Sequence, residues 1–346
     1  MKKKLLSMLL VVLLLLSMTA GCNNSQPSST DADQQQDVVN EEKTTSFTDS
    51  AGREVEVPAN ITKIVPSGSL AQIVLFALAP DMFVGLSGEW DPSAEEYIET
   101  AYYELPVLGQ FYGKDDLNLE EIAKVDPQII IDVGESKSSI VEDMDGISEQ
   151  VGIPTVHIEA TTDTMGEAYR TLGKLLGREK EAEALAEYCD KANADTKDLM
   201  DKMGEDGKVD LIYSTGEDGL SVLAKDSFHA EIIDKVSNNI AVVDDISSKG
   251  SGNPVDMEQI ITWDPDVIIL APNSAYSSVG EDETWQQLKA IKNGNYYEVP
   301  SGPYNWMGFP PSVNRYMGMI WITQLLYPEE AGYDTGRHLR NRQIIM

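Results

Sequence analysis

Residues 178–203 read REKEAEALAEYCDKANADTKDLMDKM, and small or apolar side chains recur along them at alternating spacings of three and four. These side chains are Ala182, Leu185, Cys189, Ala192, Thr196, Leu199 and Met203. The spacing predicts one buried face of a helix, which Gly177 and Gly204 bound at its two ends. At 1.5 Å per residue the helix is roughly 39 Å long. That length suits a helix that bridges two lobes; the alternative is a long surface helix of a single domain.

On both sides of this stretch, predicted strands alternate with predicted helices, which is typical of an α/β fold with a mainly parallel sheet. The predicted strands are 53–58, 61–65, 83–86, 128–133, 155–158, 209–213, 267–271 and 296–299. The predicted helices are 70–78, 118–125, 140–151, 228–236, 257–263, 284–291 and 314–326. We therefore expect an N-terminal α/β lobe at 47–158, a bridging helical segment at 159–206 and a C-terminal α/β lobe at 207–330.

An internal repeat supports two similar lobes. Residues 119–132 (LEEIAKVDPQIIID) and 257–270 (MEQIITWDPDVIIL) align at a constant offset of 138, with identical residues at six of fourteen positions. The identical positions include Glu120 and Glu258 as well as the Asp-Pro break between helix and strand. Two chance helix–Asp-Pro–strand units are the alternative, which the matching glutamates disfavour.

Composition excludes several classes of function. The 346-residue chain has a formal net charge of −32, which argues against a nucleic-acid partner because phosphate binding needs a basic surface. Two cysteines cannot form a disulfide framework, and three histidines are few for a dedicated zinc site. We expect no intrinsic cofactor and no metal held by the protein alone.

The two ends of the chain differ in composition from its centre. Residues 1–21 combine Lys2–Lys4 with an apolar run too short to span a membrane comfortably, which predicts a signal peptide. Thr19-Ala20-Gly21-Cys22 resembles a bacterial lipobox, in which Cys22 would be lipidated; a plain cleaved signal is the alternative. Residues 22–46 are polar and predict a disordered tether. The basic tail at 331–346 is atypical of this acidic chain and receives no role.

Taken with the polar tether, the opening Gly52-Arg53-Glu54-Val55-Glu56-Val57-Pro58 and the Asp-Pro-Gln-Ile-Ile-Ile element, the chain resembles the substrate-binding proteins of ABC importers for ferric siderophores, heme and cobalamin. The resemblance covers roughly residues 47–330. It implies two lobes joined by one long helix, and a monomer lipid-anchored outside the cytoplasm. The implied partners are the importer's membrane subunits with their ATPase, the membrane through Cys22, and a small metal chelate, most of all an iron chelate. It also implies that Glu120 and Glu258 dock on the membrane subunits.

A ligand between two such lobes should contact loops at the carboxyl ends of strands. The residues expected to bind it are Ser67, Trp90, Phe111, Tyr112, Asn273, Tyr276, Tyr304, Asn305 and Trp306. The aromatic rings would provide flat walls, and the serine and asparagines would orient the ligand by hydrogen bonds. Half-buried loop packing is the alternative for each ring. His229 is expected to cap or pack, and Arg315 to pair with an acid.

Members of the resembling family often carry an arginine just before the Pro pair of the last loop, where this chain has Phe309 before Pro310-Pro311. This favours a bulky, flat chelate over a strongly anionic one. Other functions stay open: binding of a non-chelate ligand or a free metal ion, a lipid-anchored α/β hydrolase or metalloenzyme, or a structural lipoprotein. The chain has none of the motifs Gly-x-Ser-x-Gly, Gly-x-x-x-x-Gly-Lys-Ser/Thr or His-Glu-x-x-His, which disfavours the enzymes.

Overall fold

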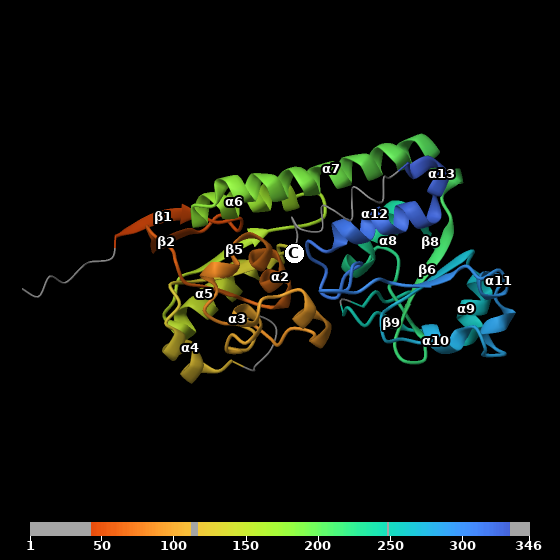
Figure 1. The fold of residues 1–346 in the computed structure, drawn as a ribbon, viewed down its shortest axis with the longest axis horizontal. Helices are drawn as coiled ribbons and strands as arrows, with labels where there is room; N and C mark the ends of the chain where they lie inside the picture. Colours follow the sequence, from red (N-terminus) through yellow and green to blue (C-terminus); the bar gives the residue numbers. More distant parts are fainter. Residues whose placement is uncertain (1–42, 112–116, 248, 333–346) are drawn as a thin grey trace, which may run out of the picture. The chain divides into compact units, whose positions relative to one another are not determined.

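The computed structural model describes residues 43–111, 117–247 and 249–332. The predicted signal peptide, Cys22, most of the tether, Tyr112 and residues 333–346 of the tail lie outside this range. The described chain forms two α/β lobes, and helix α7 (Glu179–Met203) runs along both of them. In Figure 1 the first lobe is orange to yellow and the second is teal to blue. The predicted fold class, two similar lobes joined by one long helix, is confirmed.

The first lobe is built on a parallel sheet in the order β3-β4-β5, comprising Ile64–Pro66, Ile129–Gly134 and Thr155–Glu159. A separate antiparallel pair precedes it, β1 (Thr44–Thr48) with β2 (Glu54–Pro58). The helices are α2 (Ser69–Leu78), α3 (Thr100–Tyr103), α4 (Leu119–Val125) and α5 (Ile140–Val151), with 3-10 turns at Pro80–Met82 and Pro92–Glu96.

The second lobe has a mixed sheet in the order β11-β10-β6-β7-β9, with β8 also paired to β6. Its strands are β6 (Asp210–Thr215), β7 (Ser221–Val222), β8 (Asn238–Asn239), β9 (Asn253–Pro254), β10 (Val267–Leu270) and β11 (Tyr296–Glu298). Its helices are α8 (Glu231–Val236), α9 (Met257–Trp263), α10 (Tyr276–Val279), α11 (Lys289–Lys292), α12 (Arg315–Leu326) and α13 (Pro328–Ala331). Short 3-10 turns lie at Glu205–Gly207, Phe228–Ala230 and Trp285–Gln287.

The long helix begins one residue after the predicted start and ends at the predicted Met203. Its buried face follows the predicted stripe from Ala182 to Thr196 and then continues at Met200, while Leu199 and Met203 are half-buried. A second helix, α6 (Met165–Leu176), packs beside it. Gly173 permits that close approach, because a Cβ there would lie 2.5 Å from the Cβ of Ala182.

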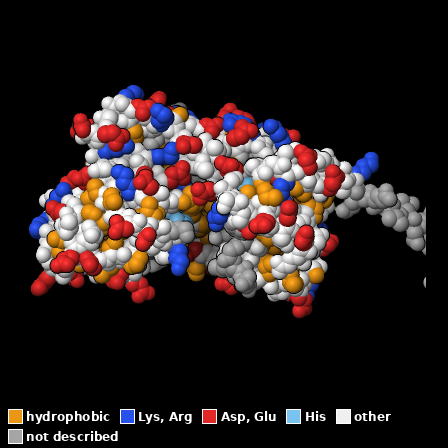
Figure 2. All heavy atoms as spheres, turned by 180° about the vertical axis from the view of Figure 1, so that it is seen from behind, with side chains coloured by type: hydrophobic (Ala, Val, Ile, Leu, Met, Phe, Trp, Pro, Cys, Tyr) orange, Lys and Arg blue, Asp and Glu red, His pale blue; other side chains and the backbone are white. Residues whose placement is uncertain are grey.

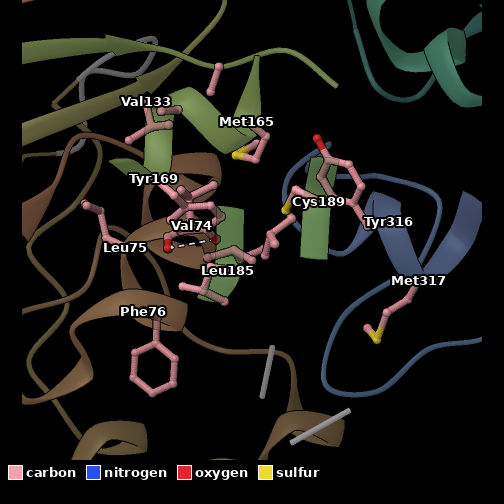
Figure 3. Close-up of a cluster of buried hydrophobic side chains, with 14 of the residues drawn as sticks. Val74, Leu75, Phe76, Val133, Met165, Tyr169, Leu185, Cys189, Tyr316 and Met317 are labelled. Carbon is pink, nitrogen blue, oxygen red and sulfur yellow. Dashed lines mark hydrogen bonds between the residues drawn. The ribbon is translucent and has the colours of Figure 1, made fainter. Parts of the chain in front are cut away.

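The alternation of side chains along the strands divides each lobe's core into two layers. In β4, Ile129 and Ile131 belong to an inner cluster, and Ile130 belongs to an outer cluster shared with α5. The inner cluster does not stop at the lobe boundary. Figure 3 shows Leu185 and Cys189 of α7 between Tyr169 on one side and Tyr316 on the other. The helix therefore carries one apolar core from the first lobe into the second.

The internal repeat predicted from the sequence recurs in the backbone. The helices α4 and α9 both begin after a capping side chain: Asn118 accepts from the Glu121 N–H, and Asp256 accepts from the Gln259 N–H. Both helices end at an aspartate in left-handed conformation, Asp126 with φ +49° and Asp264 with φ +40°. Each is followed by the proline that leads into a buried strand, so the two segments share a structure as well as a sequence pattern.

Several elements differ from the predictions. Strand β1 begins at Thr44, inside the segment predicted as a tether, because its Thr-Thr-Ser-Phe-Thr sequence pairs with the alternating strand β2. Residues 83–86 form no named strand and contribute only isolated bridges. The short strands β7, β8 and β9 and helix α6 were not predicted individually.

A polar joint fastens the lobes near the start of α6. The backbone N–H of Thr162 donates to Glu231 Oε1 of the second lobe at 3.2 Å, and its carbonyl accepts from the Tyr316 hydroxyl at 2.6 Å. The neighbouring Asp163 pairs with Lys235 at 2.8 Å, and this ion pair lowers the pKa of its carboxyl group. The segment between β5 and α6 is thus held by α8 and α12 as well as by its own lobe.

Candidate ligand-binding site

A cavity of about 470 Å³ lies between the two lobes, within the range of about 300–1,000 Å³ common for small-molecule sites. Figure 2 shows apolar side chains gathered in the hollow between the lobes, with acidic side chains spread over the visible face. The first lobe lines the cavity with Ser69, Gln72, Ile73, Glu89, Trp90 and Asp91. The second lobe contributes most of the remaining wall, including Tyr213, Thr215, His229, Asn273, Tyr304, Asn305 and Phe309.

The cavity lies at the carboxyl ends of the central strands. Ser69 opens α2 just after β3, and Asn273 follows β10. Tyr213 and Thr215 belong to β6 itself, and their spacing of two residues puts both side chains on the same face. Loops and strand ends from different parts of the chain therefore converge on one space, as in other open α/β sheets.

An aromatic pair spans the two lobes. The ring centroids of Trp90 and Tyr304 are 5.7 Å apart with an interplanar angle of 34°. Trp90 is held from behind by Phe76, whose ring centroid lies 5.0 Å away at 64°, and its indole N–H donates to the Tyr102 carbonyl at 3.3 Å. The orientation of this indole is therefore fixed before any ligand arrives.

Two phenols in the wall keep their protons. Burial raises the pKa of Tyr213 to about 12, although a weak hydrogen bond from Asn305 at 3.5 Å acts in the opposite direction. Burial also raises the pKa of Tyr304. At neutral pH both groups are neutral hydroxyls that can donate or accept hydrogen bonds. Neither is set up as the phenolate that would ligate iron directly.

The last loop of the cavity is ordered by its own polar contacts. Asn305 accepts from the Met307 N–H at 2.9 Å, and its backbone carbonyl accepts from the side chain of Asn314. Beyond it, Phe309 adopts a left-handed φ of +74° and is 66% exposed, yet it lines the cavity. Its ring covers Gly250, where a Cβ would collide with the ring and approach His229 to 3.1 Å.

Of the residues predicted to bind a ligand, Trp90, Asn273, Tyr304 and Asn305 line this cavity. Four others do not: Ser67 is buried against Asp132, Phe111 lies in the outer core of the first lobe, Trp306 is buried with its indole N–H on the Gly302 carbonyl, and Tyr276 pairs with Tyr296. Tyr112 lies outside the described residues.

The sequence prediction missed several wall residues. Gln72 faces the cavity from the first turn of α2, and Tyr213 does so from within β6. His229 lines the cavity too, although it was expected only to cap or pack. Strand alternation could have identified Tyr213, because it lies two residues before Thr215 at the end of the same strand, and side chains two residues apart share a face.

The charged side chains in the described wall are acidic. Glu89 and Asp91 lie on the first-lobe side, and both are exposed. Neither a lysine nor an arginine is among the described residues that line the cavity. Lys249 is exposed and precedes the wall residue Gly250 in the chain, but it does not itself belong to the wall.

Arg315 lies behind the wall and pairs with an acid, as predicted. It is 3% exposed, its guanidinium pairs with Glu231, and it donates to the Phe228 carbonyl at 2.6 Å. The guanidinium carbon also lies 4.9 Å from the centroid of the Phe228 ring. Burial lowers the pKa of Arg315 to about 10, and the neighbouring Glu231 opposes that shift.

Four hydrogen-bonded polar side chains in the first lobe, of which Asp132 and His157 are buried and Ser136 and Glu159 are exposed, resemble the arrangement of a serine hydrolase. His157 Nδ1 lies 2.6 Å from Asp132, and its Nε2 lies 3.0 Å from the Ser136 hydroxyl. However, that hydroxyl also donates to Glu159 at 2.9 Å, and none of these residues lines the cavity. These hydrogen bonds connect β4 with β5 and, through Ser67, with the end of β3.

Within residues 43–111, 117–247 and 249–332, no three His, Cys, Asp or Glu side chains are grouped so that they could hold a metal ion. In the same part of the chain, none of the helices combines the length and apolar character needed to cross a membrane.

Comparison with solved structures gives the same fold. An ABC transporter solute-binding protein from Sulfurospirillum deleyianum superposes with a TM-score of 0.79 at 26% identity, covering 87% of this chain and 94% of that one. The periplasmic catecholate-siderophore binding protein VctP from Vibrio cholerae superposes with a TM-score of 0.58 at 18% identity, covering 83% of this chain and the whole of that chain. At that identity the second likeness concerns the fold alone.

Among curated relatives, the Fe(3+)-citrate-binding protein YfmC of Bacillus subtilis is 28% identical over 194 residues, which are 54% of this chain and 58% of that protein. A putative ABC transporter substrate-binding lipoprotein of the same organism, YhfQ, is 26% identical over 197 residues, 53% of this chain and 59% of that protein. The matched part thus spans less than two thirds of these relatives. The family model described as periplasmic binding protein matches residues 79–303, which include most of both lobes and the helix between them. With its two lobes, bridging helix and inter-lobe cavity, the chain belongs to the periplasmic binding protein family.

Proposed function

We propose that this protein captures a metal chelate in the inter-lobe cavity and delivers it to an ABC importer. The chelate that we expect is a ferric siderophore. The observation that carries the proposal is the aromatic pair of Trp90 and Tyr304, which comes from both lobes and faces a cavity of small-molecule size. Flat rigid rings bind bulky ligands with little loss of side-chain entropy. The relative named for binding of ferric citrate supports a ferric chelate as the class of cargo.

The proposed role is binding and transport without chemistry on the ligand. Tyr213 and Tyr304 are neutral hydroxyls, and the amides of Asn273 and Asn305 can pair with ligand carbonyls. These groups orient a ligand but hold iron poorly, so the chelator would supply the metal's ligands. A lipid on Cys22 would keep the protein at the outer face of the cell membrane, where the importer takes up its cargo.

Tryptophan fluorescence tests the binding proposal directly, because Trp90 lies in the cavity wall. Ferric siderophores, heme and a corrinoid should be titrated separately, with ferric chloride and an amino acid mixture as controls. At least one chelate should quench the emission saturably, and the free ion should not. Tight binding of a free ion, a sugar or an amino acid, without binding of any chelate, would reject the proposal.

We also propose that Glu120 and Glu258 dock on the two membrane subunits. Both are exposed and occupy the same place in the first turn of the equivalent helices α4 and α9. A transporter with two similar subunits needs the same contact twice, which gives a reason for a repeated acid. The alternative is that both acids only favour the dipole at a helix N-terminus.

Uptake assays distinguish these two readings. Glu120→Arg and Glu258→Arg should each abolish uptake of the labelled chelate while its affinity for the purified protein stays unchanged. The matched controls are Glu149→Arg and Glu283→Arg, which make the same charge change at exposed positions of the same two lobes. Wild-type uptake by the double Glu120/Glu258 variant would reject the docking assignment.

A further inference from the structure

The charge of the cavity wall restricts the charge of its ligand. Glu89 and Asp91 are both acidic, and the rest of the described wall consists of neutral polar, aromatic and aliphatic residues with one histidine, His229. A wall of this kind repels a ligand with excess negative charge and attracts a positive one. The chain's net charge of −32 adds a field of the same sign around the entrance.

The buried cation behind the wall does not reverse this balance. Arg315 is ion-paired with Glu231, donates to the Phe228 carbonyl and lies over the Phe228 ring. Its Nε is buried as well and has no hydrogen-bond partner among the described residues. Gly308 lines the cavity and lies next to this side chain, since a Cβ on that glycine would lie 3.9 Å from Nε. Arg315 itself is not among the residues that line the cavity.

The neutral polar groups of the wall suit a particular kind of chelator. The amide of Asn273 and the hydroxyl of Tyr213 line the cavity and can donate to oxygen atoms and accept from amide N–H groups. The amide oxygens of Gln72 and Asn305, which also line it, already accept from the backbone N–H groups of Ser87 and Met307. Linear hydroxamate chelators contain both oxygen atoms and amide N–H groups, in their metal-binding groups and in the amides that join them. Three singly charged hydroxamates also neutralise iron(III), whereas catecholate dianions or citrate leave their iron complexes negatively charged.

We infer that the cavity takes a ferric trishydroxamate with no net negative charge, and that Glu89 and Asp91 favour a form bearing an ammonium group. This inference rests on the proposed function and narrows its substrate class. It also separates this chain from its ferric-citrate-binding relative, whose named ligand is a polycarboxylate complex.

A matched pair of ligands tests the inference. One is a linear ferric trishydroxamate with a terminal ammonium, and the other is the same chelate with that amine acetylated. Titration of the full chain should give a lower Kd for the ammonium form, by roughly three- to tenfold, the size of effect that two solvent-exposed charge contacts produce. High salt should reduce this ratio, because it screens exposed charges.

Variants of the wall locate the effect. The Kd of the acetylated form divided by the Kd of the ammonium form should fall toward one in the Glu89→Gln/Asp91→Asn double variant. It should keep its wild-type value in Glu149→Gln, which removes an exposed acid from α5. A ratio of one in the wild-type protein, or a ratio that the double variant leaves intact, would overturn the role of these two acids.

A second panel separates the charge inference from the proposed function. Ferric citrate and a ferric triscatecholate should bind more weakly than both trishydroxamates. If either anionic complex binds more tightly than both, the charge inference is wrong while the chelate-binding function stands. If no ferric chelate, heme or corrinoid binds, the proposed function itself is wrong, and the inference falls with it.

Discussion

The buried ion pair of Arg315 and Glu231 gives the sharpest test of the energetics at the lobe joint. Glu231→Gln keeps the side chain's shape and its Oε1 acceptor for the Thr162 N–H. It removes the negative charge opposite a guanidinium that is 3% exposed. The cation then retains the Phe228 carbonyl and the Phe228 ring, with Glu135 as a further acid that acts on it electrostatically.

The expected magnitude follows from burial on the two sides of the pair. Breaking a fully buried pair costs about 3–5 kcal/mol of unfolding free energy. The Glu231 side chain is 22% exposed, so solvent already screens part of the interaction, and we expect Glu231→Gln to cost about 2–3 kcal/mol. Arg315→Met leaves an acid that water can reach, and should cost about 1–2 kcal/mol. The double variant has no buried charge and should cost about 1 kcal/mol.

Urea unfolding followed by circular dichroism measures these four proteins under one condition. The decisive result is an ordering: the double variant should be more stable than Glu231→Gln alone, because Met replaces the uncompensated cation. Losses that add in the double variant would show that the two side chains contribute independently. Such additivity would refute the reasoning that the acid's main role is to neutralise a buried guanidinium.

Three further predictions concern the cavity. Because burial raises the pKa of Tyr213 to about 12 from 10, the folded protein keeps a proton that the unfolded chain loses. The free energy of unfolding should therefore fall between about pH 10 and pH 12. In urea titrations at alkaline pH, the Tyr213→Phe variant should lose about 1–3 kcal/mol less than the wild type. An equal loss in both proteins would contradict this. Gly250→Ala should displace the exposed Phe309 ring and raise the Kd for the ligand. The free energy of unfolding should change by less than about 1 kcal/mol. An unchanged Kd would contradict this prediction. Trp90→Leu should raise Kd by roughly two- to tenfold in calorimetric titrations, the size of one aromatic stacking contact with a bound ligand, and unchanged affinity would exclude that contact.

The fold was predictable where the sequence has a strong period or a strong stop signal. The long helix has both, since its apolar spacing ends at Gly177 and Gly204. The lobe repeat was predictable because residues 119–132 and 257–270 match at a constant offset, including the Asp-Pro that ends each helix. Strands of two residues, such as β7 (Ser221–Val222), have too few positions to show alternation and exist through their pairing with β6.

The site was predictable only in part, because tertiary contacts decide which way a loop side chain points. Tyr304 and Trp306 are two residues apart in one loop, yet the first lines the cavity and the second is buried with its indole N–H on the Gly302 carbonyl. Composition cannot distinguish them. Tyr276 follows β10 as expected for a ligand contact, but helix α10 turns it toward Tyr296 instead.

The inner core that passes through α7 makes the two lobes one unit of cooperativity. Leu185 and Cys189 share one apolar cluster with Val74 of the first lobe, Tyr169 of α6 and Tyr316 of the second lobe, so neither lobe can unfold without exposing apolar surface of the other. An isolated lobe would expose its own part of that core to water. A destabilising change far from the cavity, in either sheet, should therefore lower the population of the whole binding-competent protein rather than loosen one wall of its site.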